Sequence, residues 1–352
     1  MKIGILTVYF ADYGSFFQAY TLYDYLTKLG HDCELINACA RMKYSPRFNI
    51  AVHGTKILPR FVKNAIADKL DVYRTYLNLC QNVSQLKISE KFKDIQKLSQ
   101  KYDCIIVGSD ELWSATNPLI RFVPEYYGIH IACPVFSYAT SGVNLKNPSA
   151  EMLKVMKEGL SNFECISVRD KVTAEWVGNL TDQDIEIVLD PTLLNPCFEG
   201  KEKYKDNYIL IYGEHFSQDH INAIRSFAKQ KKLSVKSVVW KHDWCDAYLE
   251  TDSAEKLQDY YKSSEYVMTS TLHGTIFSIV NKRPFTSFVT ELRGLKVRLL
   301  LEQLDLENRL FENGYIGEPL SYDAVDEKLA EWRNISDAYL KNALLKVSQK
   351  KG

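Results

Sequence analysis

The 352-residue sequence lacks the patterns that mark several classes of protein. It contains no C-x-x-C pair, no G-x-x-x-x-G-K-[ST] phosphate loop, no G-x-G-x-x-G turn and no G-x-S-x-G turn. A P-loop nucleotidase, a dinucleotide-binding domain and an α/β-hydrolase are therefore poorly supported. Apolar runs are too short to span a bilayer. Basic and acidic residues both number 44, so the net charge does not favour nucleic acid as a partner.

Cysteine and histidine are present without the spacing of a disulfide framework or a zinc site. The eight cysteines are scattered, several of them within apolar stretches, at Cys33, Cys39, Cys80, Cys104, Cys133, Cys165, Cys197 and Cys245. This pattern predicts free thiols in a reducing compartment, and no metal cofactor. The first residues, MKIGILTVYF, are typical of a first strand rather than a signal peptide. We therefore expect a cytoplasmic protein.

Alternation of short apolar strands with amphipathic helices predicts an α/β fold. The length exceeds that of a usual single core, and the pattern restarts after a polar stretch at 195–207. We predict two Rossmann-like domains facing a cleft, at 1–198 and 205–325. The remaining segment, 326–352, is predicted to contain a helix that is a candidate to pack back on the first domain.

One stretch, 267–285 (VMTSTLHGTIFSIVNKRPF), combines hydroxyls, a histidine and a glycine where a strand should end and a helix begin. Backbone N–H groups and the helix dipole at such a position favour an anion, and His273 could exchange protons near neutral pH. The alternative is that Ser270 and Thr271 cap the helix and His273 is a satisfied, partly buried side chain. Spacing alone does not decide between them.

The segment 41–101 is basic, with thirteen Lys or Arg against four Asp or Glu. Its apolar positions recur at helical spacing between Ile57 and Leu77. One interpretation is contact with an anionic membrane surface or a lipid-linked diphosphate. The other is an ordinary core-facing helix with a solvated basic side.

Six segments in order along residues 1–300 resemble the polysaccharide pyruvyl transferase family. They are 13–18 (YGSFFQ), 107–113 (VGSDELW), 137–142 (SYATSG), 166–170 (ISVRD), 188–194 (VLDPTLL) and 269–274 (TSTLHG), the last followed by 281–285 (NKRPF). Each segment alone is a weak match to the family, but six segments in the right order make the resemblance strong.

The resemblance implies a glycosyltransferase-B-like architecture and transfer of pyruvate from phosphoenolpyruvate to a sugar as a ketal. The expected sugar is of galactose type or similar, in a polysaccharide precursor that could be lipid-diphosphate-linked at the inner membrane face. The donor is a substrate, so no cofactor is expected. His273 matches the histidine of the family's His-Gly motif and is expected to be the general acid. Arg169 matches the arginine of the Ser-Val-Arg motif and is expected to contact an anion.

Other strand-end residues are candidates for the site. Asp110 could orient His273, accept a sugar proton or serve only a turn, whereas Asp190, followed by Pro191, is expected to be structural. Some members of the family carry an arginine where this chain has Thr271. The missing cation could come from Arg283, Lys282, Arg293 or Arg298, and the sequence does not decide among them. The predicted substrate-binding residues are Tyr13, Gly14, Ser15, Ser109, Ser141, Ser270, Thr271, Leu272, Gly274 and Arg283.

Two other functions remain open. A nucleotide-sugar glycosyltransferase would share the two-domain plan but needs a ribose-binding acid, for which Glu214 is the one weak candidate. A non-catalytic protein could instead use the cleft as a clamp.

Overall fold

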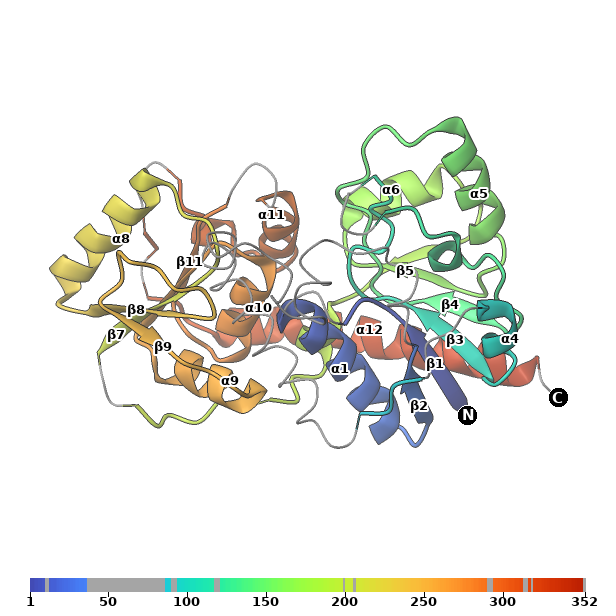
Figure 1. Cartoon of the computed structure of the whole chain (residues 1–352), viewed down its shortest axis with the longest axis horizontal. Coiled ribbons are helices and arrows are strands. Elements are labelled where there is room, and N and C mark those ends of the chain that lie inside the picture. Colours follow the sequence, from blue (N-terminus) through green and yellow to red (C-terminus); the bar gives the residue numbers. More distant parts are fainter. Residues whose placement is uncertain are drawn as a thin grey trace, which may run out of the picture. The chain divides into compact units, whose positions relative to one another are not determined.

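The computed structural model describes residues 1–9, 13–36, 86–89, 94–116, 121–198, 200–204, 207–289, 294–312, 316–317 and 319–350. Within these residues the chain is an α/β protein that divides into two compact units (Figure 1). The described part of unit 1 comprises residues up to 36, from 86 to 197 and from Leu329 onward, and unit 2 runs from Phe198 to Lys328. Most of the basic segment 41–101, including the apolar positions from 57 to 77, lies outside the described residues, so both interpretations of it stay predictions.

Unit 1 begins with a βαβ arrangement, which agrees with the predicted first strand and the predicted alternation of strands and helices. Its first sheet is parallel, in the order β2-β1-β3-β4, and consists of β1 (Lys2–Leu6), β2 (Asp32–Leu35), β3 (Cys104–Val107) and β4 (Val135–Ser137). Helix α1 (Tyr13–Lys28) joins β1 to β2. It ends just before Gly30, whose φ of 87° is left-handed and suits a residue without a Cβ.

A seam of serine hydroxyls joins this sheet to the parallel pair β5 (Ile166–Val168) and β6 (Ile185–Ile187). Ser137 Oγ accepts from the Ser167 backbone N–H and donates to the Ser167 carbonyl, both at 2.9 Å. Ser167 Oγ donates to the Ser137 carbonyl at 3.0 Å. Serine hydroxyls thus make hydrogen bonds that backbone groups would make in a regular ladder. They place β5 next to β4 at one edge of the sheet.

Side-chain caps begin the helices that follow the strands of unit 1. They cover α4 (Ile95–Ser99), α5 (Ala150–Leu160), α6 (Lys171–Gly178) and α7 (Pro191–Leu194), capped by Asp94, Ser149, Asp170 and Asp190. Each cap accepts a first-turn N–H that would otherwise lack a partner. The expected structural role of Asp190 is confirmed by its cap on α7.

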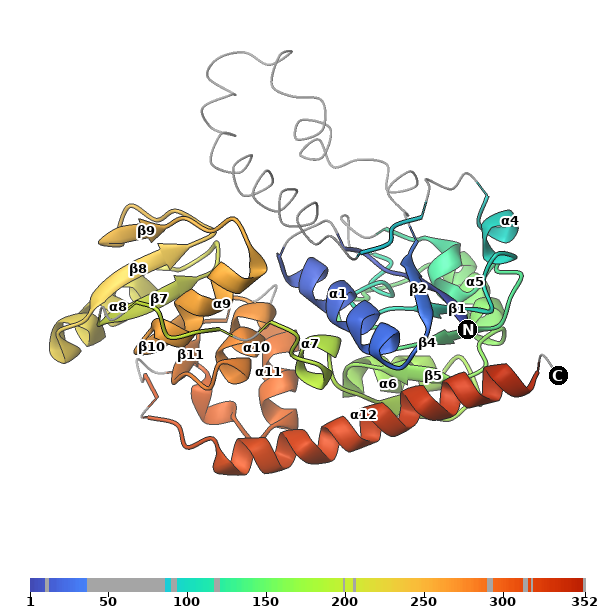
Figure 2. The same cartoon turned by 90° about the horizontal axis from the view of Figure 1, so that it is seen from below.

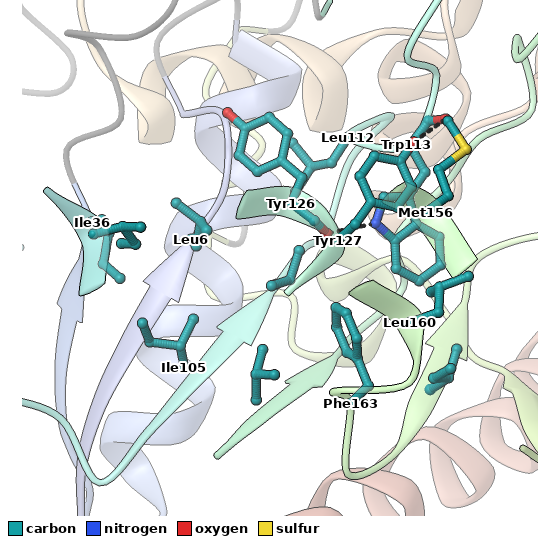
Figure 3. Close-up of a cluster of buried hydrophobic side chains, with 14 of the residues drawn as sticks. Leu6, Ile36, Ile105, Leu112, Trp113, Tyr126, Tyr127, Met156, Leu160 and Phe163 are labelled. Atoms are coloured by element: carbon teal, nitrogen blue, oxygen red, sulfur yellow. Dashed lines mark hydrogen bonds between the residues drawn. The ribbon is translucent and has the colours of Figure 1, made fainter. Parts of the chain in front are cut away.

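A hydrophobic core of unit 1 surrounds Trp113, which is fully buried. Its indole N–H donates to the Tyr126 carbonyl at 2.7 Å, and the Tyr127 hydroxyl donates to the Trp113 carbonyl at 3.0 Å (Figure 3). Both residues belong to a short 3-10 helix, Pro124–Tyr127. This core fixes the loop after β3, which carries Ser109 and Asp110.

Unit 2 is a second parallel sheet in the order β11-β10-β7-β8-β9. Its strands are β7 (Tyr208–Tyr212), β8 (Ser234–Val238), β9 (Ala247–Leu249), β10 (Tyr266–Thr269) and β11 (Phe285–Ser287). Its helices are α8 (Gln218–Lys231), α9 (Ala254–Ser263), α10 (Leu272–Val280) and α11 (Gly294–Gln303), with a 3-10 turn at Glu307–Arg309. The strand–helix pattern predicted to restart after the polar stretch at 195–207 is present, and the short strand β9 was not expected.

Helix α12 (Asp323–Gln349) is the long red helix of Figure 2, and the boundary between the units falls within it. In unit 1, Ser336 Oγ accepts from the Leu189 N–H at 2.9 Å, and Arg333 Nε donates to the Leu193 carbonyl at 2.8 Å. Tyr339 donates to the Ser137 carbonyl at 2.8 Å. These bonds tie α12 to the serine seam and to the segment around α7.

Two smaller expectations can be compared with the structure. Six of the eight cysteines are described, and all six are free thiols, as expected. No helix among the described residues is long and apolar enough to cross a membrane.

Candidate functional site

The carboxyl-terminal edge of unit 1 gathers polar side chains from successive strands. Because all the strands are parallel, the loops that follow them emerge on one edge, where α/β proteins usually bind ligands. Ser109 and Asp110 follow β3, Ser141 follows β4, and Arg169 follows β5. The structure therefore brings these four predicted residues to the same edge.

Arg169 is almost fully buried, with 8% of its surface exposed. Its Nη1 donates to Asp190 Oδ2 at 2.9 Å, while Asp190 Oδ1 accepts the Thr192 N–H at 3.0 Å. One carboxylate thus caps α7 and holds the guanidinium. Arg169 Nη2 is also buried, and it has no hydrogen-bond partner among the described residues.

Several carboxylates surround the Arg169 charge. Burial alone would lower the pKa of this guanidinium, but the carboxylates of Asp190, Asp110, Glu111 and Asp170 outweigh burial and hold its pKa above the ordinary value. Four carboxylates therefore stabilise the charged form of this one guanidinium.

The loop after β3 is held by its own hydrogen bonds. Ser109 Oγ accepts the Asp110 N–H at 2.7 Å, and Thr7 Oγ1 donates to the Ser109 carbonyl at 2.8 Å. Asp110 is partly exposed, has a φ of 85°, and its Oδ1 accepts the Glu111 N–H at 2.8 Å. The fully buried Ser109 hydroxyl supports the turn, while Asp110 is more accessible.

The Ser141 side chain serves the next helix. Its hydroxyl donates to Asp170 Oδ2 at 2.7 Å, and Asp170 Oδ1 accepts from the N–H and hydroxyl of Thr173, both at 2.8 Å. Since Ser141 is fully buried, it orients the α6 cap. This is a structural role at the edge of the candidate site.

Tyr13, Gly14 and Ser15 form the buried first turn of α1, which follows β1. Gln18, one turn later, donates from Nε2 to the carbonyls of Val8 and Ser15, both at 2.7 Å. Sequence reasoning placed Gln18 inside a family segment without giving it a role. The sequence signal that could have identified Gln18 is its place as a polar residue on a helix face that is otherwise apolar.

In unit 2, His273 lies in the first turn of α10. Thr271 is the N-cap, and its Oγ1 accepts the Gly274 N–H at 3.0 Å. Ser270 and Leu272 are buried, whereas Thr271 and His273 are partly exposed. Of the two predicted caps, Thr271 is the one that caps the helix, and His273 stands beside it at the carboxyl-terminal edge of β10.

Gly274 is required by close packing. A Cβ at this position would lie 1.9 Å from Thr269 Oγ1 and 2.8 Å from Tyr212 Cδ1. Both contacts are far too short, so α10 can approach β10 and β7 closely only with glycine here. The packing fixes the direction in which the first turn, and His273 with it, leaves the sheet.

Arg283 does not lie with His273. Helix α10 separates the two, and its nine residues correspond to about 13 Å of helix. Arg283 follows the helix and precedes β11, at the amino-terminal edge, where Nη1 donates to the Ser264 carbonyl at 3.2 Å. The prediction that Arg283 replaces the family arginine near Thr271 is therefore not supported by this geometry.

The structure does not support the alternative cations either. Lys282 pairs with Asp326, and Arg298 Nη1 lies 2.8 Å from Glu312 Oε1 on an exposed surface. Arg293 lies outside the described residues. Of the predicted site residues that the structure describes, one group lies in unit 1 and a second lies around His273 in unit 2. Arg283 belongs to neither group. Across the described part of the chain, no three His, Cys, Asp or Glu side chains are grouped so as to hold a metal.

Comparison with solved structures defines the class of this fold. The chain is similar to S. aureus MnaA in its co-structure with UDP, with 11% identity and a TM-score of 0.50, over 96% of this chain and 91% of that one. It also matches the UDP-GlcNAc 2-epimerase of Methanocaldococcus jannaschii, with 10% identity and a TM-score of 0.47, over 94% and 91% of the two chains. Identities this low concern the fold alone, which is glycosyltransferase-B-like with two Rossmann-like domains.

The sequence identifies the family. The model of the polysaccharide pyruvyl transferase family matches residues 12–291, which is most of the chain. The chain therefore belongs to the polysaccharide pyruvyl transferase family. A comparison with curated proteins gave no match.

Proposed function

We propose that this protein transfers the pyruvyl group of phosphoenolpyruvate to two hydroxyls of a saccharide, forming a cyclic ketal and releasing phosphate. The family match over residues 12–291 carries the proposal. The position of His273 in the first turn of α10 supports it, because an acid is needed beside an anionic donor.

The reaction can be balanced without a cofactor. A proton added to C3 of the enol leaves a cationic centre at C2, which one sugar hydroxyl attacks. Phosphate then departs and a second hydroxyl closes the ketal. The two hydroxyls release two protons, of which one replaces the proton used at C3 and the other leaves with phosphate.

His273 is the proposed acid that protonates C3. The first turn of α10 supplies backbone N–H groups and the positive end of the helix dipole, both of which favour the donor's anionic groups. The Thr271 hydroxyl is already engaged as the cap. In this chain, therefore, backbone and imidazole take a larger share of anion binding than in family members with arginine at this position.

Asp110 is the proposed acceptor of a sugar proton. It is the partly exposed carboxylate of the β3 loop, and the neighbouring Ser109 fixes its backbone. A carboxylate within reach of a hydroxyl can accept its proton as the bond to C2 forms. The Asp110→Asn variant is expected to lower kcat much more than it changes the KM for phosphoenolpyruvate.

The direct test is phosphate release from phosphoenolpyruvate with galactose-, glucose- and N-acetylmannosamine-type acceptors, free and lipid-diphosphate-linked. Products are analysed by mass spectrometry for one added pyruvyl ketal. Acceptor-dependent release with a ketal product supports the proposal. Sugar transfer from UDP-sugars, with no reaction of phosphoenolpyruvate, would replace it by the glycosyltransferase alternative. Binding of saccharide without any turnover would indicate a non-catalytic clamp.

A further inference from the structure

A tryptophan lies at the same sheet edge of unit 2 as the proposed acid. Trp240 comes two residues after β8, and His273 comes four residues after β10. Because the strands are parallel, both residues emerge at the carboxyl-terminal edge. Strand β7 lies between β10 and β8, so the two strand ends are two inter-strand spacings, about 10 Å, apart. The proposed reaction steps do not use Trp240.

Ring contacts hold the Trp240 side chain at this edge. Its indole is half-buried and meets the ring of Tyr212, the last residue of β7, with centroids 5.0 Å apart and an angle of 82° between the planes. The buried Tyr212 ring also meets Phe277 of α10 at 5.8 Å, and Phe277 lies 6.0 Å from the His273 ring. An edge-to-face contact covers at most one face of the indole. Trp240 is thus held in place while part of its ring stays accessible.

The backbone before Trp240 is in a rare conformation. Val239 has a φ of 67°, and the Trp240 N–H donates to the Val238 carbonyl at 2.8 Å, which closes a three-residue turn. A left-handed φ is an outlier for a β-branched residue, and a turn of this kind is strained. Such strain persists only where the surrounding structure requires it, and it collects at ligand-binding sites. Here it turns the chain sharply at the end of β8 and sets Trp240 beside Tyr212.

The strand end between Trp240 and His273 begins with a glycine. A Cβ on Gly213 would lie 2.1 Å from Ser270 Oγ, so no other residue fits without a shift of the β10 loop. The Gly213 carbonyl accepts from His242 Nε2 at 2.8 Å, which ties this strand end to the loop after β8. The first position between the tryptophan and the proposed acid therefore carries no side chain.

The chemistry of an indole face suits a sugar ring and not an anion. The face of an aromatic ring is negative, so it attracts the weakly positive C–H groups of a pyranose and repels a phosphate or carboxylate. A tryptophan also offers a large, rigid contact area at a low cost in conformational entropy. A second site for phosphoenolpyruvate is therefore disfavoured at Trp240, whereas a neutral saccharide is favoured.

We propose that Trp240 is a stacking platform for the acceptor saccharide, on which one C–H face of a pyranose ring lies. The inference rests on the proposed function in taking the ligand to be a saccharide. Stacking fixes the plane of the ring and leaves its hydroxyls at the rim free to face the donor at the α10 turn. Trp240 thereby selects the acceptor and orients it, and it takes no part in proton transfer.

Trp240→Leu tests the platform because it keeps an apolar side chain and removes the ring. The variant is expected to raise the KM for the acceptor by about three- to tenfold, with the KM for phosphoenolpyruvate changed less than about twofold. Trp240→Phe keeps an aromatic face and should recover most of the loss. The matched control is Phe227→Leu, a half-buried ring that packs at 5.1 Å on Tyr266, the first residue of β10 at the opposite edge. It should change neither constant.

An unchanged KM for the acceptor in a folded Trp240→Leu variant would overturn the proposal, whatever happens to the KM for phosphoenolpyruvate. Thermal melting checks that each variant is folded. If Trp240→Leu does not fold, the fluorine NMR signal of Trp240 in protein labelled with 5-fluorotryptophan decides the question. The chain has five tryptophans, and loss of one signal in Trp240→Phe assigns it. The assigned signal should shift on addition of the acceptor, and a signal that stays in place would contradict the platform.

Saccharide-observed NMR with neutral galactosides and glucosides separates the platform from the proposed reaction. Saturation transfer to the C–H protons of one sugar face, present in the wild type and lost in Trp240→Leu, would support the platform even if no phosphate is released. Phosphate release with the same acceptor binding in both proteins would leave the reaction standing and refute the platform. Stacking of UDP on Trp240, with no binding of neutral saccharide, would also refute it and favour the glycosyltransferase alternative.

Discussion

Arg169 and Asp190 form a buried ion pair in which Nη1 and Oδ2 are 2.9 Å apart. Arg169 follows β5, and Asp190 caps α7 after β6, so the pair links two neighbouring strand ends. Because the same carboxylate accepts the Thr192 N–H, the helix start and the guanidinium are fixed together. The pair thus holds the guanidinium in place at the edge of unit 1.

Replacing Asp190 by asparagine tests the pair. Asparagine caps helices well, so α7 should remain, while Arg169 loses its directly bonded charge. Breaking a buried pair usually costs about 3–5 kcal/mol, and we expect about 2–3 kcal/mol because three other carboxylates remain nearby. Urea unfolding measures the change in free energy. The matched control is Asp170→Asn, another buried strand-end cap, which should lose less than half as much; equal losses would contradict the special role of Asp190.

Replacing Gly274 by alanine tests the packing beneath His273. The added Cβ would lie 1.9 Å from Thr269 Oγ1, so the helix start must shift. We expect a loss of about 1–3 kcal/mol in unfolding free energy, as for other overpacked sites, and a lower kcat. The control is Gly178→Ala in α6, where the nearest atom is 3.7 Å away. It should be neutral or stabilising by about 0.5–1 kcal/mol. A well-tolerated Gly274→Ala would show that the close approach is not needed.

The serine seam predicts a stability cost at a position with no ligand role. Ser137→Ala removes the acceptor of the buried Ser167 N–H, which should cost about 1–3 kcal/mol in unfolding free energy. Ser161→Ala, on the exposed end of α5, should change it by less than about 0.5 kcal/mol. Both are measured by urea unfolding. Similar small effects for the two would mean that β4 and β5 are held without the hydroxyls.

Stability should fall as the solution is acidified below neutral pH. Burial lowers the pKa of His242 and outweighs the opposing bond from its Nε2 to the Gly213 carbonyl. Burial also lowers the pKa of His31 and His220. The unfolded chain therefore binds more protons than the folded one, so stability is complete above the ordinary histidine value near 6.5 and declines below it.

The measurement is the urea midpoint between pH 7.5 and pH 5.5, a range that brackets the ordinary histidine value. His242→Gln keeps a donor for the Gly213 carbonyl and should reduce the slope. A wild-type midpoint that rises on acidification would contradict the direction of these shifts.

The sequence predicted local elements well because apolar periodicity is a local signal. The predicted alternation of strands and helices is present in both units, and the structural role of Asp190 follows from the Asp-Pro pair. The short strand β9 was missed because its three residues, Ala247–Leu249, are too few to show an alternating pattern.

Relationships across the chain were harder to predict. Arg283 is ten residues from His273 in sequence, but the intervening helix carries it to the other edge of the sheet. The Ser137–Ser167 seam depends on which strands become neighbours, and small polar residues in apolar strands do not reveal that. The buried state of Gln18 and its three acceptors likewise became visible only once α1 was placed on β1.

The central claim is that His273 supplies the proton for pyruvyl transfer. The measurement is acceptor-dependent phosphate release from phosphoenolpyruvate by the wild type, His273→Ala and the control His31→Ala. His31 precedes β2 at the amino-terminal edge of unit 1, so its variant should keep wild-type activity. We predict that His273→Ala loses at least about a hundredfold in kcat, as expected for removal of a general acid, while it stays folded. Release at the wild-type rate by His273→Ala would contradict the account.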